Sequence, residues 1–170
     1  MFIIRKGKPV LVINVEFINP FLKSLLNVLS TMAQTEATHS QPSIKTNTVA
    51  KGDVTGIIGM VGNKVIGSLS ITFTKSAALD ITNKMLGEKI TEIDDTVTDL
   101  VGEVTNMVTG GAKRLLADIG HDFDMATPTV IAGANHEIHH QCQGRIIQIP
   151  FKSKSGAFFV EISFEERAEL

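Results

Sequence analysis

Apolar residues in this chain follow two spacings, one typical of helices and one typical of strands. Between residues 94 and 119 they recur every three or four positions, which at about 100° per residue places them on one stripe of a long helix. The stripe comprises Val97, Val101, Val104, Val108, Ala112, Leu115, Leu116 and Ile119. We predict that this stripe packs against the rest of the protein and that the helix stops at Gly120.

Helical spacing predicts two further helices. Asn19 and Pro20 precede an apolar stripe, which indicates a helix from 20 to about 33 because proline fits the first helical position. An earlier start near Val15, with a kink, is the alternative. A short helix is expected at 75–86, followed by Gly87 as a typical residue just past a helix end.

Strands are predicted where β-branched and apolar residues lie between turn residues. Residues 54–61 and 65–73 indicate a hairpin joined by residues 62–64. The other expected strands are 44–49, 123–132, 144–151 and 157–164, with 152–156 as the last turn. The elements together predict an α+β fold in which a mostly antiparallel sheet packs against two long helices plus a short helix. A helix followed by a strand pair occurs twice, which is a weak internal pseudo-repeat.

The length of the chain fits a single domain, and its net charge is small. It has 170 residues, 20% of them charged, and a net charge of -2, so we expect no nucleic acid partner. No stretch approaches the roughly 20 apolar residues of a membrane span, so no membrane partner is expected. The single cysteine, Cys142, excludes an intramolecular disulfide and fits a cytoplasmic protein.

The domain is expected to span residues 14–165. Residues 1–13 are interpreted as an extended or disordered leader, because their apolar runs are short and interrupted by basic residues and a proline; an added strand is the alternative. Residues 166–170 are expected to form a C-terminal tail.

The polar face of the long helix carries the candidate chemistry. Glu103 and Asn106 lie three positions apart and are neighbours on a helix surface, so they could contact one substrate and orient a water; a merely solvated face is the alternative. Gly110 and Gly111 follow, although each glycine costs a helix interior about 0.5 to 1 kcal/mol relative to alanine. They could admit another molecule close to the backbone, or relieve packing against a neighbouring element.

A His-Glu-x-x-His pattern at residues 136–140 suggests zinc chemistry, with His121 and Cys142 as further donors. The pattern binds zinc only when a helix places His136 and His140 on one face. Here we expect a connection between strands, in which residues four apart are separated by more than about 10 Å if extended. A polar loop is therefore preferred and no metal site is predicted, while a zinc hydrolase remains as an alternative.

The long helix and the strand after it resemble the signature of the CheC/CheX/FliY phosphatases of bacterial chemotaxis. The residues that carry the resemblance are Asp99, Glu103, Asn106, Gly110, Gly111 and Pro128. The opening segment 16–21 and the single good Glu-x-x-Asn copy look most like the CheX branch. Glu16 and Asn19 echo that copy, but Pro20 biases Asn19 away from helical backbone angles, so a second site is not predicted.

The resemblance implies a phosphatase that hydrolyses the aspartyl phosphate of CheY or a CheY-like receiver domain, and a homodimer joined through sheet edges. In the family scheme Asn106 orients the attacking water and Glu103 contacts a lysine of the receiver, which supplies its own Mg²⁺, so no resident cofactor is expected. The expected receiver contacts are Asp99, Gly110, Gly111, Lys113 and Pro128. A non-catalytic module that binds a receiver with the same helix face is the alternative.

Overall fold

The computed structural model describes residues 2–4, 11–13 and 15–167, and side chains within 15–167. The helices in this part of the chain are α1 (Val15–Ala33), α2 (Lys75–Leu86) and α3 (Asp95–Ala117). The short strands are β1 (Phe2–Ile4), β2 (Leu11–Ile13), β3 (Ala37–His39), β4 (Ser43–Lys45), β7 (Phe123–Met125) and β8 (Thr129–Ala132). The long strands are β5 (Val54–Gly62), β6 (Val65–Phe73), β9 (Ile146–Ser153) and β10 (Gly156–Glu166).

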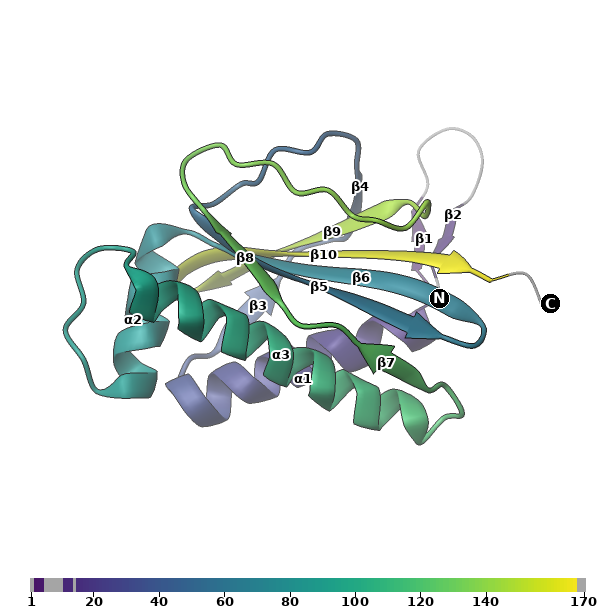
Figure 1. The fold of residues 1–170 in the computed structure, drawn as a ribbon, viewed down its shortest axis with the longest axis horizontal. Coiled ribbons are helices and arrows are strands. Elements are labelled where there is room, and N and C mark those ends of the chain that lie inside the picture. Colours follow the sequence, from purple (N-terminus) through teal and green to yellow (C-terminus); the bar gives the residue numbers. More distant parts are fainter. Residues whose placement is uncertain (1, 5–10, 14, 168–170) are drawn as a thin grey trace.

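The main sheet has eight strands, and every pairing in it is antiparallel. Its order is β3-β9-β10-β6-β5-β7, with β4 also paired to β9 and β8 also paired to β5. The four long strands therefore form the centre, and each edge consists of two short strands. Helices α1 and α3 lie along one face of the sheet, with α2 at one end (Figure 1). This arrangement confirms the predicted α+β class.

The core lies between the sheet and the two long helices. Alternate residues of β6 and β10 point toward the helices and stand opposite each other, with Phe158 paired to Phe73 and Val160 paired to Ile71. All four are at most 1% exposed. Full burial of one such side chain contributes about 1.5–3 kcal/mol. The alternation fixes the register of these strands, because a slip by one residue would turn the apolar set away from the helices.

The second face of the sheet is polar around Ser68, Ser70 and Glu161, and the segments 46–53 and 133–145 cover this part (Figure 1). These segments pair with each other: the N–H of Ala50 donates to the carbonyl of His136 at 2.9 Å, and the N–H of Ile138 donates to that of Thr48 at 2.8 Å. Beneath them, Glu161 forms an ion pair with Lys45, and both side chains are at most 3% exposed. Helices thus cover one face of the sheet and loops cover part of the other, where Val61 near the end of β5 stays 50% exposed.

The hairpin β5–β6 and helix α2, with Gly87 at φ 67°, confirm the predictions for these segments. The predicted strand 44–49 is confirmed only at residues 44 and 45, which belong to β4; beyond them the chain forms an isolated bridge at Val49, and β3 was not predicted. The predicted strand 123–132 is broken into β7 and β8. Strand β10 continues to Glu166, which the sequence assigned to the tail.

Helix α1 begins at Val15, so the start expected at Pro20 is wrong and the earlier alternative is confirmed. Phe17 and Ile18 are 6% and 2% exposed, and their burial extends the helix in front of Pro20. In the leader, β1 and β2 pair with each other and not with the main sheet. Residues 1 and 5–10 of the predicted leader, residue 14 of the predicted domain and residues 168–170 of the predicted tail lie outside the described residues. No helix in the described ranges is long and apolar enough to cross a membrane.

Candidate functional site

Helix α3 is fixed at its start and along its inner side. The side chain of Asp94 accepts a hydrogen bond from the N–H of Val97 at 3.1 Å and so caps the helix. The buried residues are Val97, Leu100, Val101, Val104, Thr105, Val108, Thr109, Ala112 and Leu116. The predicted stripe is confirmed except at its end, where Leu115 is half-buried and Ile119, beyond the last helical residue, is 47% exposed.

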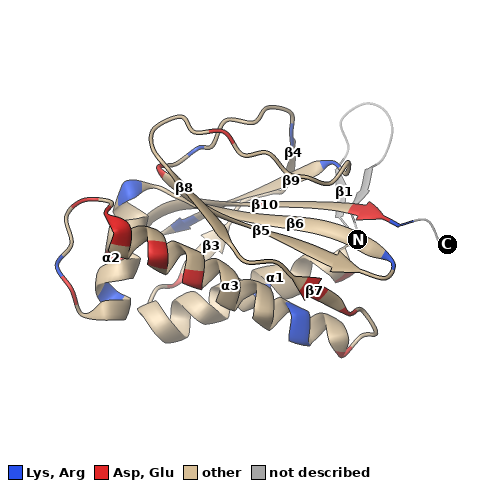
Figure 2. Cartoon of the chain, viewed as in Figure 1, with Lys and Arg blue, Asp and Glu red and all other residues tan. Residues whose placement is uncertain are grey.

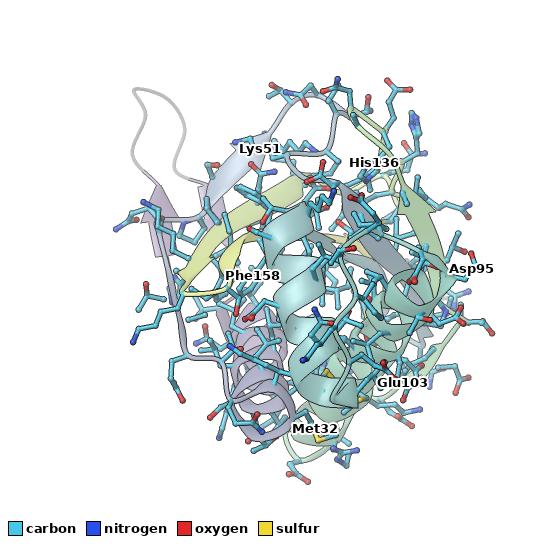
Figure 3. All side chains as sticks on the ribbon, turned by 90° about the vertical axis from the view of Figure 1, so that its left-hand side faces the viewer. Met32, Lys51, Asp95, Glu103, His136 and Phe158 are labelled. Carbon is cyan, nitrogen blue, oxygen red and sulfur yellow. The ribbon has the colours of Figure 1, made fainter. Side chains whose placement is uncertain are left out.

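The opposite side of α3 is open. Asp99, Glu103 and Asn106 are exposed, and Gly110 and Lys113 continue the same stripe at half-buried positions. Figure 3 places Glu103 on the same side of the molecule as Asp95, away from Phe158 in the core. Among the described residues, no hydrogen bond or ion pair engages the side chains of Asp99, Glu103 or Asn106. Their polar groups are therefore available to a partner.

A groove of about 680 Å³ runs between this face and the segment that contains β7 and β8. One wall belongs to α3 and the other to residues 125–132, which lie beside it in Figure 1. The residues that line it are Thr98, Asp99, Gly102, Glu103, Asn106, Met125, Ala126, Thr127, Pro128, Val130 and Ala132. The structure thus brings Asp99, Glu103, Asn106 and Pro128 together in one groove.

Residues 126–128 form the outer wall because the edge of the sheet is interrupted there. Residues 129–132 pair with 54–57 of β5, and 123–125 pair with 60–62. The N–H of Ala126 donates to the carbonyl of Gly59 at 3.0 Å, while Thr127 and Pro128 stand outside the ladder. Pro128 has no N–H to donate, so an interruption at an edge suits it. Pro128 is the sequence signal that could have indicated the break, and with it Thr127, a groove residue that the sequence analysis missed.

Two glycines allow α3 to lie close to this edge. A Cβ added at Gly56 of β5 would stand 2.0 Å from Oγ1 of Thr105, and one added at Gly102 would stand 3.3 Å from Cγ2 of Val130. Without a side chain at Gly56, the helix can sit directly on the strand. The groove depends on this close contact, because Thr105 immediately precedes Asn106.

The two alternatives for the glycine pair divide between its members. A Cβ at Gly111 would stand 2.2 Å from Oγ of Ser24, whose hydroxyl donates to the carbonyl of Val108 at 2.7 Å, so Gly111 serves the packing of α3 against α1. A Cβ at Gly110 would meet nothing within 4 Å. Of the two, only Gly110 leaves open space beside the backbone.

Charge on α3 is divided along its length. Acidic positions lie on the half toward α2 and basic ones toward the other end, as Figure 2 shows. Near that basic end, Nζ of Lys113 lies 4.0 Å from Asp122 and 3.8 Å from Asp124. The groove itself is lined by two carboxylates and no basic residue.

The histidines of the His-Glu-x-x-His pattern belong to the opposite side of the sheet. Nε2 of His136 lies 2.6 Å from Oγ1 of Thr55, and its Nδ1 lies 2.7 Å from the carbonyl of Gly133. Nδ1 of His140 lies 2.8 Å from Oγ of Ser68, and its Nε2 lies 3.0 Å from Oε2 of Glu161. Segment 136–140 is a loop, and within the described ranges no three His, Cys, Asp or Glu residues are grouped to hold a metal. All four ring nitrogens therefore have partners that hold this loop against the sheet. His136 is labelled in Figure 3.

Glu161 is the titratable group that this packing perturbs. Burial alone would raise its pKa, but hydrogen bonds from His140 and Lys45, with their charges, outweigh burial and hold the pKa of Glu161 below its usual value. Further hydrogen bonds come from Ser70 at 3.3 Å and Gln148 at 3.2 Å. The carboxylate is thus fully engaged within the protein, which marks it as structural.

Glu16 and Asn19 lie exposed on α1, and the helix includes both. The expectation that Pro20 removes Asn19 from helical conformation is therefore wrong. Neither residue lines the groove beside α3.

Fold and groove define an α+β protein with a polar helix face beside an open groove at a sheet edge. A model of the family described as chemotaxis phosphatase CheX matches residues 54–152, more than half of the chain. The chain therefore belongs to the CheX family.

Similar proteins extend the likeness over most of the chain. A CheC-like superfamily protein from Shewanella sp. PV-4 is 59% identical with a TM-score of 0.85, over 90% of this chain and 99% of that one. CheX from Borrelia burgdorferi, solved in complex with CheY, BeF3 and Mg²⁺, is 28% identical with a TM-score of 0.75, over 90% and 100%. The CheY-P phosphatase CheX of Thermotoga maritima is 25% identical over 134 residues, 78% of this chain and 84% of that protein.

Proposed function

We propose that this protein is a phosphatase that hydrolyses the aspartyl phosphate of CheY or a CheY-like response regulator. Family membership supports the reaction, since the similar protein from Thermotoga maritima is a CheY-P phosphatase. The Borrelia burgdorferi relative, solved together with CheY, supports the partner. The observation that carries the proposal is the placement of Glu103 and Asn106, exposed and without partners of their own among the described residues, on a rigid helix beside a groove.

Asn106 orients the attacking water. Its amide both donates and accepts hydrogen bonds, so it can hold a water in line with the phosphorus atom without changing protonation state. The water oxygen then forms a bond to phosphorus as the bond to the aspartate oxygen breaks, which leaves inorganic phosphate and a free carboxylate. An acyl phosphate is already reactive, and phosphoryl transfer is catalysed chiefly by positioning and charge stabilisation, so one placed amide suffices.

Glu103 aligns the two proteins. Its carboxylate lies one helical turn from Asn106 and is free to pair with a lysine of the receiver, a charge-assisted contact that fixes the depth and direction of docking. The receiver contributes the Mg²⁺ that neutralises the phosphoryl group. The contact surface extends over Asp99, Gly110, Lys113 and Pro128; Gly111, also predicted from the sequence, faces Ser24 of α1.

The experiment follows the decay of the phosphorylated receiver by phosphate release. Wild-type protein should accelerate the decay, and Asn106→Ala should lower the acceleration by about 10²-fold, as removal of one oriented donor does in other sites. Asn27→Ala is the matched control, because Asn27 is an exposed amide on α1 outside the groove. A receiver that binds the wild-type protein but keeps its phosphate lifetime would establish a non-catalytic binding module instead.

We also propose a homodimer joined through a sheet edge. The available edges are the pair β3 and β4 and the pair β7 and β8. The second pair walls the groove, so joining through β3 and β4 leaves both grooves accessible. Sedimentation equilibrium would report the mass, and a monomer at all concentrations would exclude the dimer.

A further inference from the structure

The groove contains an excess of negative charge that nothing on its walls balances. Asp99 and Glu103 stand at positions i and i+4 of α3, where like charges destabilise a helix. Asp99 is the fifth residue of the helix, past the first turn whose free N–H groups favour acids. Lys113, the basic residue on the same face of α3, does not line the groove and lies within 4.0 Å of Asp122 and Asp124. Among the described residues, no ion pair offsets this repulsion, so the acidic pair destabilises the free protein.

The opposite wall of the groove has a different chemistry. It is formed by Met125, Ala126, Pro128, Val130 and Ala132, with one hydroxyl, that of Thr127. A partner element that fills the groove therefore meets carboxylates on one side and apolar surface on the other. The element that complements both is amphipathic, with a cationic side chain toward α3 and an apolar side chain toward residues 125–132.

We propose that Asp99 selects the receiver: it pairs with a cationic side chain beside the phosphorylation site and supplies affinity without taking part in hydrolysis. This inference rests on the proposed function and adds to it a determinant of substrate choice. Asp99 lies two turns from Asn106, so it contacts the docked surface and not the reacting atoms. Receivers that carry a neutral or acidic residue at the facing position are poor substrates.

Kinetics with phosphorylated CheY test this role. Asp99→Asn should raise KM three- to fivefold, about the effect of one exposed ion pair, and leave kcat unchanged. The effect should shrink as salt rises from low ionic strength toward about 1 M, because the pair is exposed to solvent. Asp118→Asn is the matched control, because this substitution removes the same charge at the other end of α3, outside the groove. Its KM should equal that of the wild type.

A direct binding measurement separates this inference from the proposed function. The dissociation constant of the beryllofluoride-loaded receiver should rise with Asp99→Asn and stay constant with Asp118→Asn, whether or not hydrolysis occurs. Equal constants for the two variants overturn the role of Asp99 even if the protein is an active phosphatase. If the wild-type protein does not accelerate decay of the phosphorylated receiver, but the dissociation constants of the two variants still differ, the phosphatase proposal is refuted. The role of Asp99 in recognition is then retained.

Charge reversal locates the facing cation. Asp99→Lys should weaken binding about tenfold or more, and a receiver in which the facing Lys or Arg is changed to Glu should restore it. The receiver variants are made one at a time across the cations around the phosphorylation site. Recovery with one variant supports a direct pair, and failure of every variant to recover binding refutes it. Thermal unfolding of each Asp99 variant confirms that the fold is intact.

Discussion

Gly56→Ala tests whether the groove depends on the close packing of α3 against β5. The added Cβ would stand 2.0 Å from Oγ1 of Thr105, 3.0 Å from its Cβ and 3.2 Å from the carbonyl oxygen of Val101. Rotation of Thr105 gives little relief, because its own Cβ is too close and its hydroxyl donates to Val101 at 2.7 Å. Helix and strand must separate.

Overpacking of this kind costs about 1–3 kcal/mol, and replacing glycine returns up to about 1 kcal/mol by restricting the unfolded chain. We expect a net loss of about 1–2 kcal/mol in the free energy of unfolding, measured in urea by circular dichroism. Phosphate release should also slow, because Thr105 immediately precedes Asn106. The second variant Thr105→Ala removes the hydroxyl and should reduce the penalty of Gly56→Ala by about half.

Gly59→Ala is the control, since it lies on the same strand and its added Cβ meets nothing within 4 Å. It should leave stability and rate near those of the wild type. If Gly56→Ala unfolds at the same urea concentration as Gly59→Ala, close packing at Gly56 does not hold α3 in place, and the reasoning is refuted.

The remaining predictions concern burial and packing away from the groove wall. Because the pKa of Glu161 is lowered in the folded protein, its ionised form stabilises the fold above the ordinary value of 4.5, and this contribution is lost as pH falls through the folded pKa. Glu161→Gln should cost about 3 kcal/mol at pH 7, since Lys45 then stays buried without its partner, and urea unfolding at pH 3 should show a smaller difference from the wild type. In helix α3, Gly110→Ala should stabilise the protein by about 0.5–1 kcal/mol, whereas Gly111→Ala should destabilise it by colliding with Ser24; thermal unfolding that ranks the two alike would contradict this.

Helix α3 was predicted well because the pattern that defines it is local in the sequence. The spacing of Val97, Val101, Val104 and Val108 determines which side of α3 is buried, so the opposite positions of Glu103 and Asn106 follow without knowledge of the rest of the fold. The hairpin β5–β6 was predicted for a similar reason, since its turn lies within three residues of sequence.

The groove required information that the local sequence does not contain. Thr127 lines it because β5 pairs with two separate short strands; Pro128 marks the break between them, but apolar spacing does not show that the break faces α3. Strand β3 was missed and β4 was placed only in part, because these short segments depend on pairing with β9, far along the chain. At Pro20, burial of Phe17 and Ile18 outweighs the local preference of the residue before proline.

The short strands at the two borders of the sheet limit how molecules of this protein can add to one another. On one border β3 and β4 have three residues each, and on the other β7 and β8 have three and four. Long continuous borders invite open-ended stacking into fibrils, whereas interrupted ones offer only a few backbone groups at a time. The short strands at both borders therefore lower the tendency of this protein to aggregate through its sheet edges.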